Sequence, residues 1–460
     1  MSTGDVVSIV FFASTLLILA TGLPIAFSLA GLSLMFAGVG YAFGVFDLST
    51  LVHLPIRYFS VMTNEVLVAV PLFILMGSVL ERSGIAEGLL TTMGKLFGAL
   101  RGGLGYSVIV VGALLAASTG VVGATVATMA LIALPAMLKA RYDRRLATGV
   151  ICASATLAQI IPPSTVLIFT ADLLSAVNQS AQMRMGNFAV STLSAGDLFA
   201  GALLPGFVLV SLYLAYTFGL ALLQPHKVPA SALSQDERRR LPREVVSVLI
   251  PPLFLILAVL GSILAGIATP TESASIGVLG AALLAALNRR FSWKLAAEAG
   301  RHTMITTAMI FAIVLAASLF SLTFRGLGGE HMVEQALTDM PGGAAGAMLT
   351  VMAVMFVLGF FLDTFEIILI MLPICGGPLI MMGVDPIWLG VMVAMCLQTS
   401  FLTPPFGYTL FYIRGLAPRS VSTGDIWIGA LPFVALQLMG LAIVWWFPQM
   451  ATWLPSVVFR

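Results

Sequence analysis

Two short stretches interrupt long uncharged runs of this chain: Gln159-Ile160-Ile161-Pro162-Pro163-Ser164 and Thr399-Ser400-Phe401-Leu402-Thr403-Pro404-Pro405. A proline has no backbone N–H and cannot continue a helix, so a proline pair leaves backbone carbonyl groups without helical partners. Inside a lipid bilayer such carbonyls are tolerated only where protein, water or an ion satisfies them. One stretch lies in each half of the chain, and we interpret both as broken membrane helices that build a binding site.

The composition is that of a protein embedded in a membrane. Of the 460 residues, 59% are hydrophobic and 9% are charged, and the mean hydropathy is +1.06. A water-soluble domain does not need so much apolar surface, whereas each membrane-spanning helix takes about 20 apolar residues. Residues 1–56 contain no Lys or Arg, so we expect no cleaved signal peptide. The sequence predicts an all-α polytopic membrane protein.

The sequence offers no pattern for catalysis. Its cysteines, Cys152, Cys375 and Cys396, lie far apart within apolar runs and show neither CxxC nor Cys/His spacing. It contains no nucleophile motif and no phosphate-binding glycine loop. We therefore expect that the protein is not an enzyme.

The chain reads as two repeats of similar layout. A basic linker at 224–243 separates a first repeat, 1–223, from a second, 244–460. A short amphipathic stretch follows the third apolar segment of each half, at 84–101 and at 325–341. A long apolar block and then a proline-broken segment come next in both halves. This shared order is typical of the inverted repeats of transporters.

The long apolar blocks predict two re-entrant hairpins. The first holds 34 uncharged residues, 105–138. As one straight helix it would be about 51 Å long, too long for a hydrocarbon core of about 30 Å, but two full spans would need about 40 residues. We expect hairpin tips at Ser118-Thr119-Gly120 and near Asp363-Thr364. The predicted boundaries are 105–139 and 342–384 for the hairpins and 144–174 and 386–413 for the broken helices.

The basic residues predict the orientation. With the N-terminus outside, 18 of the 22 Lys and Arg residues lie on the cytoplasmic side, which satisfies the positive-inside bias. Only Arg57, Arg184, Arg325 and Arg460 lie outside. The hairpins then enter from opposite faces of the membrane, so that their tips and the broken helices meet near its midplane.

A sodium site is the first chemistry that these segments suggest. Sodium takes about five or six oxygen ligands, which unwound backbone and nearby hydroxyl groups supply without fixed charge. The alternative is that each proline pair only kinks a helix and that the hydroxyl groups bond back to it. Two copies at matching places favour a site. The candidate sodium ligands are Ser118, Thr119, Gly120, Pro162, Pro163, Asp363, Thr364, Thr399, Thr403 and Pro404.

Carboxylates inside apolar segments are costly, so Asp363, Glu366 and Glu272 stand out. Glu366 either caps a half-helix or lines an aqueous cleft, and Glu272 is either functional or a helix-start signal after Pro270. An anionic substrate would be held by the N-termini of half-helices, whose free amide groups favour a carboxylate. The candidate substrate-binding residues are Ser118, Gly123, Ser164, Thr269, Glu272, Pro405 and Gly407.

Several runs resemble the large membrane (M) subunit of tripartite ATP-independent periplasmic (TRAP) transporters. These runs are spread in order over nearly the whole chain: 70–77, 117–120, 160–164, 266–272 and 402–407. Two further runs, 361–363 and 398–401, with the extra loop 175–196, are most similar to the branch often labelled mannitol/chloroaromatic. The branch label names few tested substrates, so we do not infer mannitol.

The resemblance implies an elevator carrier of the ion-transporter superfamily in the inner (plasma) membrane. Its partners would be a small four-helix membrane (Q) subunit and a soluble periplasmic substrate-binding (P) protein. Family members mostly take up carboxylates with a sodium gradient, so sodium ions would be the coupling ions. The alternative is a stand-alone anion/sodium symporter or antiporter of the same superfamily. Both hypotheses place the chain among secondary active transporters.

Overall fold

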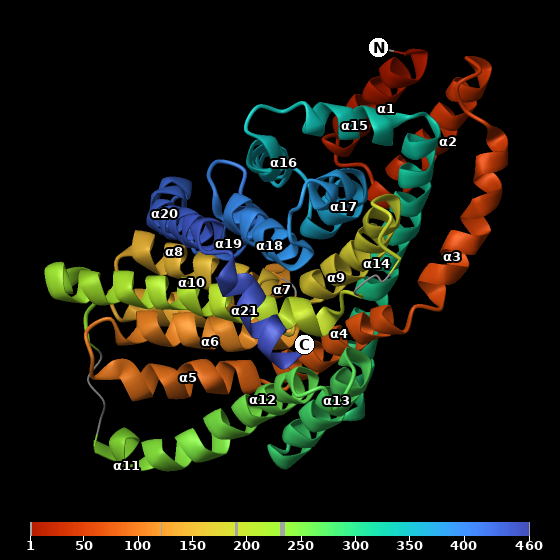
Figure 1. Cartoon of the computed structure of the whole chain (residues 1–460). Coiled ribbons are helices and arrows are strands. Elements are labelled where there is room, and N and C mark those ends of the chain that lie inside the picture. The colour runs from red at the N-terminus through yellow and green to blue at the C-terminus, as the bar shows by residue number, and fades with distance from the viewer. Residues whose placement is uncertain (1, 121, 189–191, 231–234, 460) are drawn as a thin grey trace. The chain divides into compact units, whose positions relative to one another are not determined.

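Every secondary-structure element that the structure describes is a helix. The computed structural model describes residues 2–120, 122–188, 192–230 and 235–459. Figure 1 shows the helices α1 (Thr3–Leu19), α2 (Ile25–Ala42), η1 (Leu48–His53), α3 (Leu54–Met62), α4 (Glu65–Arg82), α5 (Ile85–Gly98), α6 (Gly103–Thr119), α7 (Val122–Lys139), α8 (Arg144–Thr156), η2 (Leu157–Gln159), α9 (Thr165–Arg184), α10 (Ala195–Leu223), η3 (Pro225–Lys227), α11 (Gln235–Glu244), η4 (Val245–Leu249), α12 (Ile250–Leu264), α13 (Pro270–Leu287), α14 (Trp293–Gly326), α15 (Gly329–Thr338), α16 (Gly343–Leu358), α17 (Thr364–Met381), α18 (Pro386–Leu402), α19 (Tyr408–Leu416), α20 (Thr423–Trp446) and α21 (Gln449–Val458).

The chain divides into two compact units, each of which draws on both halves of the sequence. Unit 1 comprises Met1–Leu67, Phe169–Ser194 and Ile305–Gly390, and unit 2 comprises the rest, Val68–Ile168, Ala195–Met304 and Val391–Arg460. Such a division groups helices by contact, whereas the repeats 1–223 and 244–460 are defined by the order of elements. The repeat boundaries therefore stay a prediction.

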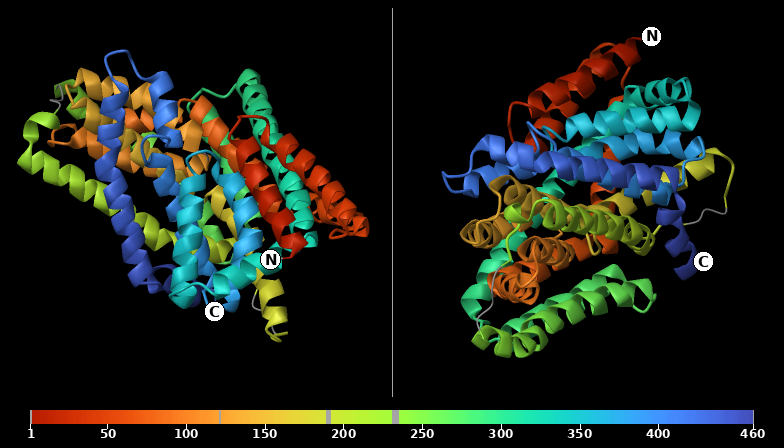
Figure 2. Two further views of the ribbon diagram at one scale, coloured as in Figure 1. Left: turned by 90° about the horizontal axis from the view of Figure 1, so that it is seen from above. Right: turned by 90° about the vertical axis from the view of Figure 1, so that its left-hand side faces the viewer.

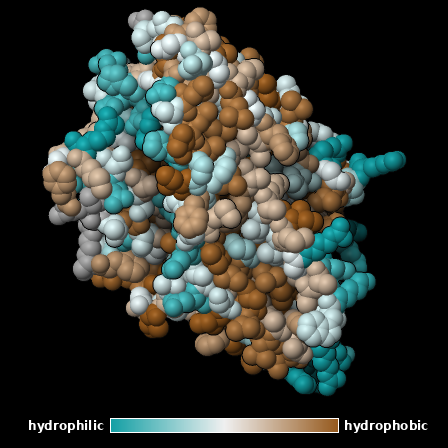
Figure 3. Space-filling model, turned by 90° about the vertical axis from the view of Figure 1, so that its right-hand side faces the viewer, coloured by the Kyte–Doolittle hydropathy of each residue, from teal (hydrophilic) through white to brown (hydrophobic). Residues whose placement is uncertain are grey.

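The helices are suited to a membrane. In the part of the chain that the structure describes, eight helices are long and apolar enough to cross a bilayer. A ninth span results if η1 and α3 together with α4, a bent pair, count as one. Large apolar side chains are exposed, among them Phe27 at 80%, Phe254 at 71% and Leu279 at 71% of their surface. Figure 3 shows broad hydrophobic areas on one face of the molecule. Lipid, and not water, is the natural solvent for such surfaces.

Both expected hairpins are present. Helices α6 and α7 pack against each other in unit 2, and α16 and α17 do so in unit 1. The broken segments are also present, as α8, η2 and α9 in the first half and as α18 and α19 in the second. Helix α9 continues to Arg184, past the predicted end of the first broken helix at 174.

The same glycine pattern precedes each hairpin. The amphipathic helices α5 and α15 both begin after a left-handed glycine, Gly84 (φ 72°) and Gly328 (φ 89°). The first hairpin helices, α6 and α16, do the same after Gly102 (φ 83°) and Gly342 (φ 92°). Only glycine adopts this conformation without steric cost, so it can reverse the chain tightly at these four points. The two halves thus share their turns as well as their order of elements.

Aromatic rings fill the core of unit 1. The ring of Phe11 lies 5.0 Å from that of Phe36 and 4.7 Å from that of Phe320, measured between centroids. These contacts join α1, α2 and the part of α14 that begins at Ile305. All three rings are buried, and burying a large aromatic side chain is among the strongest apolar contributions to packing.

Glycines bring two helices of unit 2 into backbone contact. A Cβ atom at Gly149 of α8 would lie 2.0 Å from the carbonyl oxygen of Gly429 of α20, and one at Gly429 would lie 2.0 Å from the carbonyl oxygen of Arg145. Figure 2 shows blue α20 beside yellow-green α10 and the orange helices of the same unit. Small residues permit such close approach, which is how helices pack tightly in lipid. This packing holds α8, the first arm of a broken helix, in place.

Candidate functional site

The two breaks have the same backbone conformation at their proline pairs. The peptide bonds Pro162-Pro163 and Pro404-Pro405 are both cis. The first break connects α8 and η2 to α9, and Pro162, Pro163 and Ser164 in it are all buried. The second connects α18 to α19, and there Pro404 is half-buried and Pro405 exposed. Both breaks leave short irregular backbone next to the N-terminus of a new helix.

Hydroxyl groups line both breaks and bond back to the chain. Thr399 Oγ1 donates to the carbonyl oxygen of Met395 at 2.8 Å, and Thr403 Oγ1 donates to that of Thr399 at 2.7 Å. Ser164 Oγ donates to the carbonyl oxygen of Gln159 at 3.1 Å. The back-bonding alternative is therefore realised. Each hydroxyl group donates its hydrogen atom to a carbonyl oxygen but keeps its oxygen lone pairs, so it remains able to ligate a cation.

The first hairpin tip meets the first break inside unit 2. Thr165 Oγ1 donates a hydrogen bond to the carbonyl oxygen of Gly120 at 2.8 Å. Gly120 has φ +60°, and a Cβ atom there would lie 3.1 Å from the backbone nitrogen of Thr165. The tip thus approaches the N-terminus of α9 as closely as a glycine allows. The side chains of Ser118 and Thr119, which we expected to be ligands, lie outside the described residues, and so does Val121.

The second arm of the first hairpin meets the helix that follows the second break. A Cβ atom at Gly123 would lie 3.2 Å from Tyr412 Cζ and 3.3 Å from the hydroxyl oxygen of Tyr408. The Tyr408 hydroxyl donates to that of Tyr412 at 3.1 Å. Gly407 is also needed for space, because a Cβ atom there would lie 2.7 Å from the carbonyl oxygen of Phe401. Unit 2 therefore gathers the candidate residues of the first hairpin and of both breaks.

A buried polar cluster lies beside the breaks in the same unit. Gln437 Nε2 donates to Thr156 Oγ1 at 3.0 Å and to the Tyr213 hydroxyl at 2.8 Å. Thr156 ends α8 just before the first break, and the fully buried Gln398 directly precedes Thr399. Low dielectric strengthens hydrogen bonds within such a cluster. The cluster fixes α8 to α10 and α20 where the first break begins.

The second hairpin places a pair of carboxylates in unit 1. The backbone N–H of Asp363 donates to Glu366 Oε2 at 3.2 Å in a capping box at the start of α17. Glu366 is only 3% exposed, and Asp363 is half-buried. Among the residues that the structure describes, no basic side chain forms an ion pair with either acid. The capping alternative for Glu366 is realised, and the described part of the chain gives neither acid an ion-pair partner.

Thr269 and Glu272 form a reciprocal capping box at the start of α13. The Thr269 N–H and hydroxyl donate to Glu272 Oε2 at 2.8 and 2.9 Å, and the Glu272 N–H donates to Thr269 Oγ1 at 3.2 Å. Both residues are exposed at the start of α13. This is the helix-start signal that the sequence left open. A substrate-binding role for the two residues stays a prediction.

Residues 12–450 match the family model described as "Tripartite ATP-independent periplasmic transporter, DctM component". The chain belongs to this family. It is a TRAP large permease component, a multi-pass protein of the inner membrane and not an enzyme. The TRAP assignment covers both hairpins and both broken segments.

Curated relatives extend over nearly the same length. The C4-dicarboxylate TRAP transporter large permease protein DctM of Rhodobacter capsulatus is 27% identical, with 98% of this chain and 99% of that protein covered. The ectoine TRAP transporter large permease protein TeaC of Halomonas elongata is 26% identical, with 98% and 99% covered. The sialic acid TRAP transporter permease protein SiaT of Haemophilus influenzae is 25% identical, with 94% of this chain but 68% of that protein covered.

A solved structure shares the fold. The crystal structure of the YdaH transporter of Alcanivorax borkumensis matches with a TM-score of 0.59 and 15% sequence identity, covering 97% of this chain and 99% of that one. At this identity the likeness supports the architecture alone.

Sequence reasoning missed the tyrosines that border the TRAP hairpin. Tyr408 and Tyr412 are one helical turn apart, and their rings lie 4.8 Å apart between centroids. The spacing of four residues on a short helix was the available signal. What the sequence could not provide was the partner, because Gly123 lies far away along the chain and has no side chain to mark it.

Proposed function

We propose that this chain is the large permease subunit of a transporter in which a sodium gradient drives uptake of an organic carboxylate. A periplasmic binding protein delivers the substrate, and a small four-helix membrane subunit completes the permease. The hairpin elements carry the substrate across by a rigid-body, elevator-type movement. The observation that carries the proposal is the family match over 12–450 together with the uncompensated acid pair at Asp363 and Glu366.

The acid pair supports a bound cation. Two carboxylates close together in an apolar environment repel each other, and a cation between or beside them relieves that repulsion. Separately, within unit 2, the hydroxyl and carbonyl oxygens at the two breaks are neutral ligands of the kind that sodium accepts. Within the described residues no three His, Cys, Asp or Glu side chains gather into a metal site, so a site for a transition metal has no support.

The relatives support the substrate class. Two of the three relatives above are named for acids, a C4-dicarboxylate and sialic acid. In this chain the N-termini of α9 and α19 begin next to Ser164 and Gly407, where free backbone N–H groups favour an anion. We assign the carboxylate to these helix ends.

The partners follow from the family. A tripartite transporter has three components, and this chain is one of them. The sialic acid permease is longer than this chain, which covers 68% of it. We propose a small four-helix membrane subunit and a periplasmic binding protein as the other two components.

Reconstitution tests this proposal. Proteoliposomes containing this chain, the small subunit and the binding protein are expected to accumulate a carboxylate only under an inward sodium gradient. Replacing sodium with choline is the control for the ion. Uptake that is equally fast in choline would remove sodium coupling, and uptake by this chain alone would favour a stand-alone symporter.

A further inference from the structure

Unit 1 contains a cavity of about 340 Å³ that the sodium and substrate candidates do not use. Four helices line it, each with residues spaced so that they share one face: α3, α9, α14 and α17. The size lies at the lower end of what small-molecule sites need. The wall is largely apolar, and a few polar groups converge on it. The polar residues are Arg57, Ser60, Asp172, Ser180, Ser318, Ser321 and Arg325.

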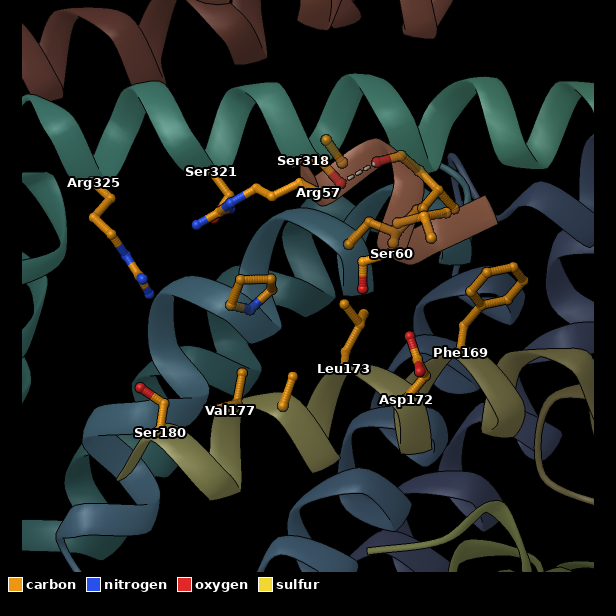
Figure 4. Close-up of a pocket in the computed structure, with 16 residues that line it drawn as sticks. Arg57, Ser60, Phe169, Asp172, Leu173, Val177, Ser180, Ser318, Ser321 and Arg325 are labelled. Atoms are coloured by element: carbon orange, nitrogen blue, oxygen red, sulfur yellow. Dashed lines mark hydrogen bonds between the residues drawn. The ribbon is translucent and has the colours of Figure 1, made fainter. Parts of the chain in front are cut away.

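The polar groups are divided between the ends of the cavity. Figure 4 shows the guanidinium groups of Arg57 and Arg325 near Ser321 at one end, and Asp172 at the other. The carboxylate of Asp172 accepts a hydrogen bond from Asn64 Nδ2 at 2.6 Å. One end is therefore cationic and the other acidic.

At the cationic end, three arginines (Arg57, Arg184 and Arg325) face two glutamates (Glu330 and Glu334), so one positive charge is in excess. Arg325 pairs with Glu330, and Arg184 pairs with Glu334 at 2.9 Å. Glu330 also lies 3.5 Å from Arg184. Arg57 forms no ion pair or hydrogen bond with any residue that the structure describes. His331 adjoins the same group of charges and adds no negative charge to it. One anionic group would complete the balance.

Three of the four basic residues that the charge distribution places outside the cytoplasm meet here. Arg57 and Arg325 line the cavity, and Arg184 and Arg325 line the pocket next to it. Both pockets include Ser180. The arginines end or begin helices on the side predicted to face the binding protein. The predicted orientation thus puts the cavity on the side of the membrane from which an anion arrives.

At its acidic end, where Phe169 lies beside Asp172, the cavity adjoins the second hairpin (Figure 4). Phe169, which lines the cavity, packs against Phe365, with ring centroids 5.4 Å apart. Phe365 lies between the two acids of the capping box. Leu369 and Pro373 of the same helix complete the wall. The contact between these two rings therefore links the wall of the cavity to the turn that carries the two acids.

We propose that this cavity is a receiving site for a hydroxylated organic monocarboxylate, whose carboxylate binds Arg57 and Arg325 and whose hydroxyl groups face the serines and Asp172. The proposal rests on the proposed function and narrows its substrate class. Guanidinium groups bind carboxylates through paired, charge-assisted hydrogen bonds. A second carboxylate at the far end would meet the negative charge of Asp172, so dicarboxylates of the same length are disfavoured.

Arginine protection tests the site without any transport. The full-length chain in lipid nanodiscs is treated with phenylglyoxal, and peptide mass spectrometry gives the modification rate of each arginine. Choline gluconate is expected to slow the modification of Arg57 and Arg325 but not that of the exposed Arg301 on the first half of α14. Choline chloride at equal ionic strength is the control. Glucarate, which keeps the carbon chain and inner hydroxyl groups of gluconate and carries a second carboxylate at the far end, is expected to need about tenfold higher concentration.

Variants sharpen the test. Arg57→Gln is expected to raise the gluconate concentration that protects Arg325 about tenfold. Arg301→Gln removes an exposed arginine that does not line the cavity, and it is expected to leave that concentration unchanged. Asp172→Asn is expected to make glucarate as effective as gluconate. Three outcomes would each overturn the proposal: equal slowing at Arg301, no protection of Arg57 by gluconate, or glucarate matching gluconate in the wild type. Because the assay contains neither partner nor gradient, protection without transport would reject only the proposed function, and transport without protection only this site.

Discussion

The ring of Phe169 packs edge-on against the ring of Phe365, with centroids 5.4 Å apart and planes at 77°. Phe169 is 1% exposed and Phe365 5%. The contact joins α9, the second arm of the first broken helix, to the first turn of α17 in the second hairpin. It therefore positions the turn that carries Asp363 and Glu366.

Shortening Phe169 should loosen that turn. Phe169→Ala removes a buried ring and leaves a void, which typically costs about 3 kcal/mol or more. We expect a lower apparent melting temperature and a smaller stabilisation by sodium, since a ligand stabilises only the state that binds it. Thermal unfolding with and without sodium measures both effects. Phe361→Ala, at a ring that is 57% exposed, is the control; equal losses in the two variants would contradict the assigned role.

Neutralising either acid of the second hairpin should weaken sodium coupling. Asp363→Asn and Glu366→Gln each keep the shape of the side chain and remove a charge. We expect the sodium concentration for half-maximal uptake to rise about tenfold, which corresponds to about 1.4 kcal/mol. Uptake against sodium concentration is the measurement. The control is Asp5→Asn, at the capping-box position in α1 that Glu366 holds in α17, and it should leave the sodium dependence unchanged. If both hairpin variants also behave like the wild type, the two acids are not part of the cation site.

The positions of these elements could be predicted from sequence because their signals are local. A run of 34 uncharged residues is too long for one span, and each proline pair must end a helix. The capping box of Asp363 and Glu366 likewise needs only a spacing of three residues. All of these features follow from the chain within a few residues of themselves.

Adding a methyl group at the first hairpin tip should harm both stability and transport. Gly120→Ala forces an L-residue to φ +60°, which costs about 1–2 kcal/mol, and brings its Cβ to 3.1 Å from Thr165. Gly186→Ala separates the two effects, because Gly186 has φ +79° but no atom within 4 Å of the new Cβ. We expect both variants to melt earlier and only Gly120→Ala to lose uptake. Full uptake by Gly120→Ala would show that the close approach to Thr165 is not needed.

Removing the buried amide of Gln437 should destabilise unit 2. Gln437→Leu deletes the donor to Thr156 and Tyr213 and leaves their oxygens buried, at a cost of about 1–3 kcal/mol. We expect a lower apparent melting temperature, and less than additive loss when Tyr213→Phe is combined with it. Leu438→Ala, on the neighbouring 48% exposed residue of α20, is the control. Strict additivity would indicate that the two side chains act independently.

The contacts between site residues that lie far apart along the chain could not be predicted from sequence. Thr165 meets Gly120, and Gly123 meets Tyr408, across separations that no local pattern encodes. The cavity of unit 1 is a stronger case, because Arg57 and Arg325 read in the sequence only as charges outside the cytoplasm. Tertiary packing alone brings them to one wall.

The close approach of Gly149 to Gly429, and of Gly429 to Arg145, has a genetic consequence. At each position the obstacle to a side chain is a main-chain oxygen, 2.0 Å from where the Cβ would lie, and no replacement of the facing residue can withdraw it. A suppressor screen started from Gly149→Ala should therefore recover no changes at Gly429. Revertants should instead restore glycine, or arise at distant sites that let α8 and α20 drift apart.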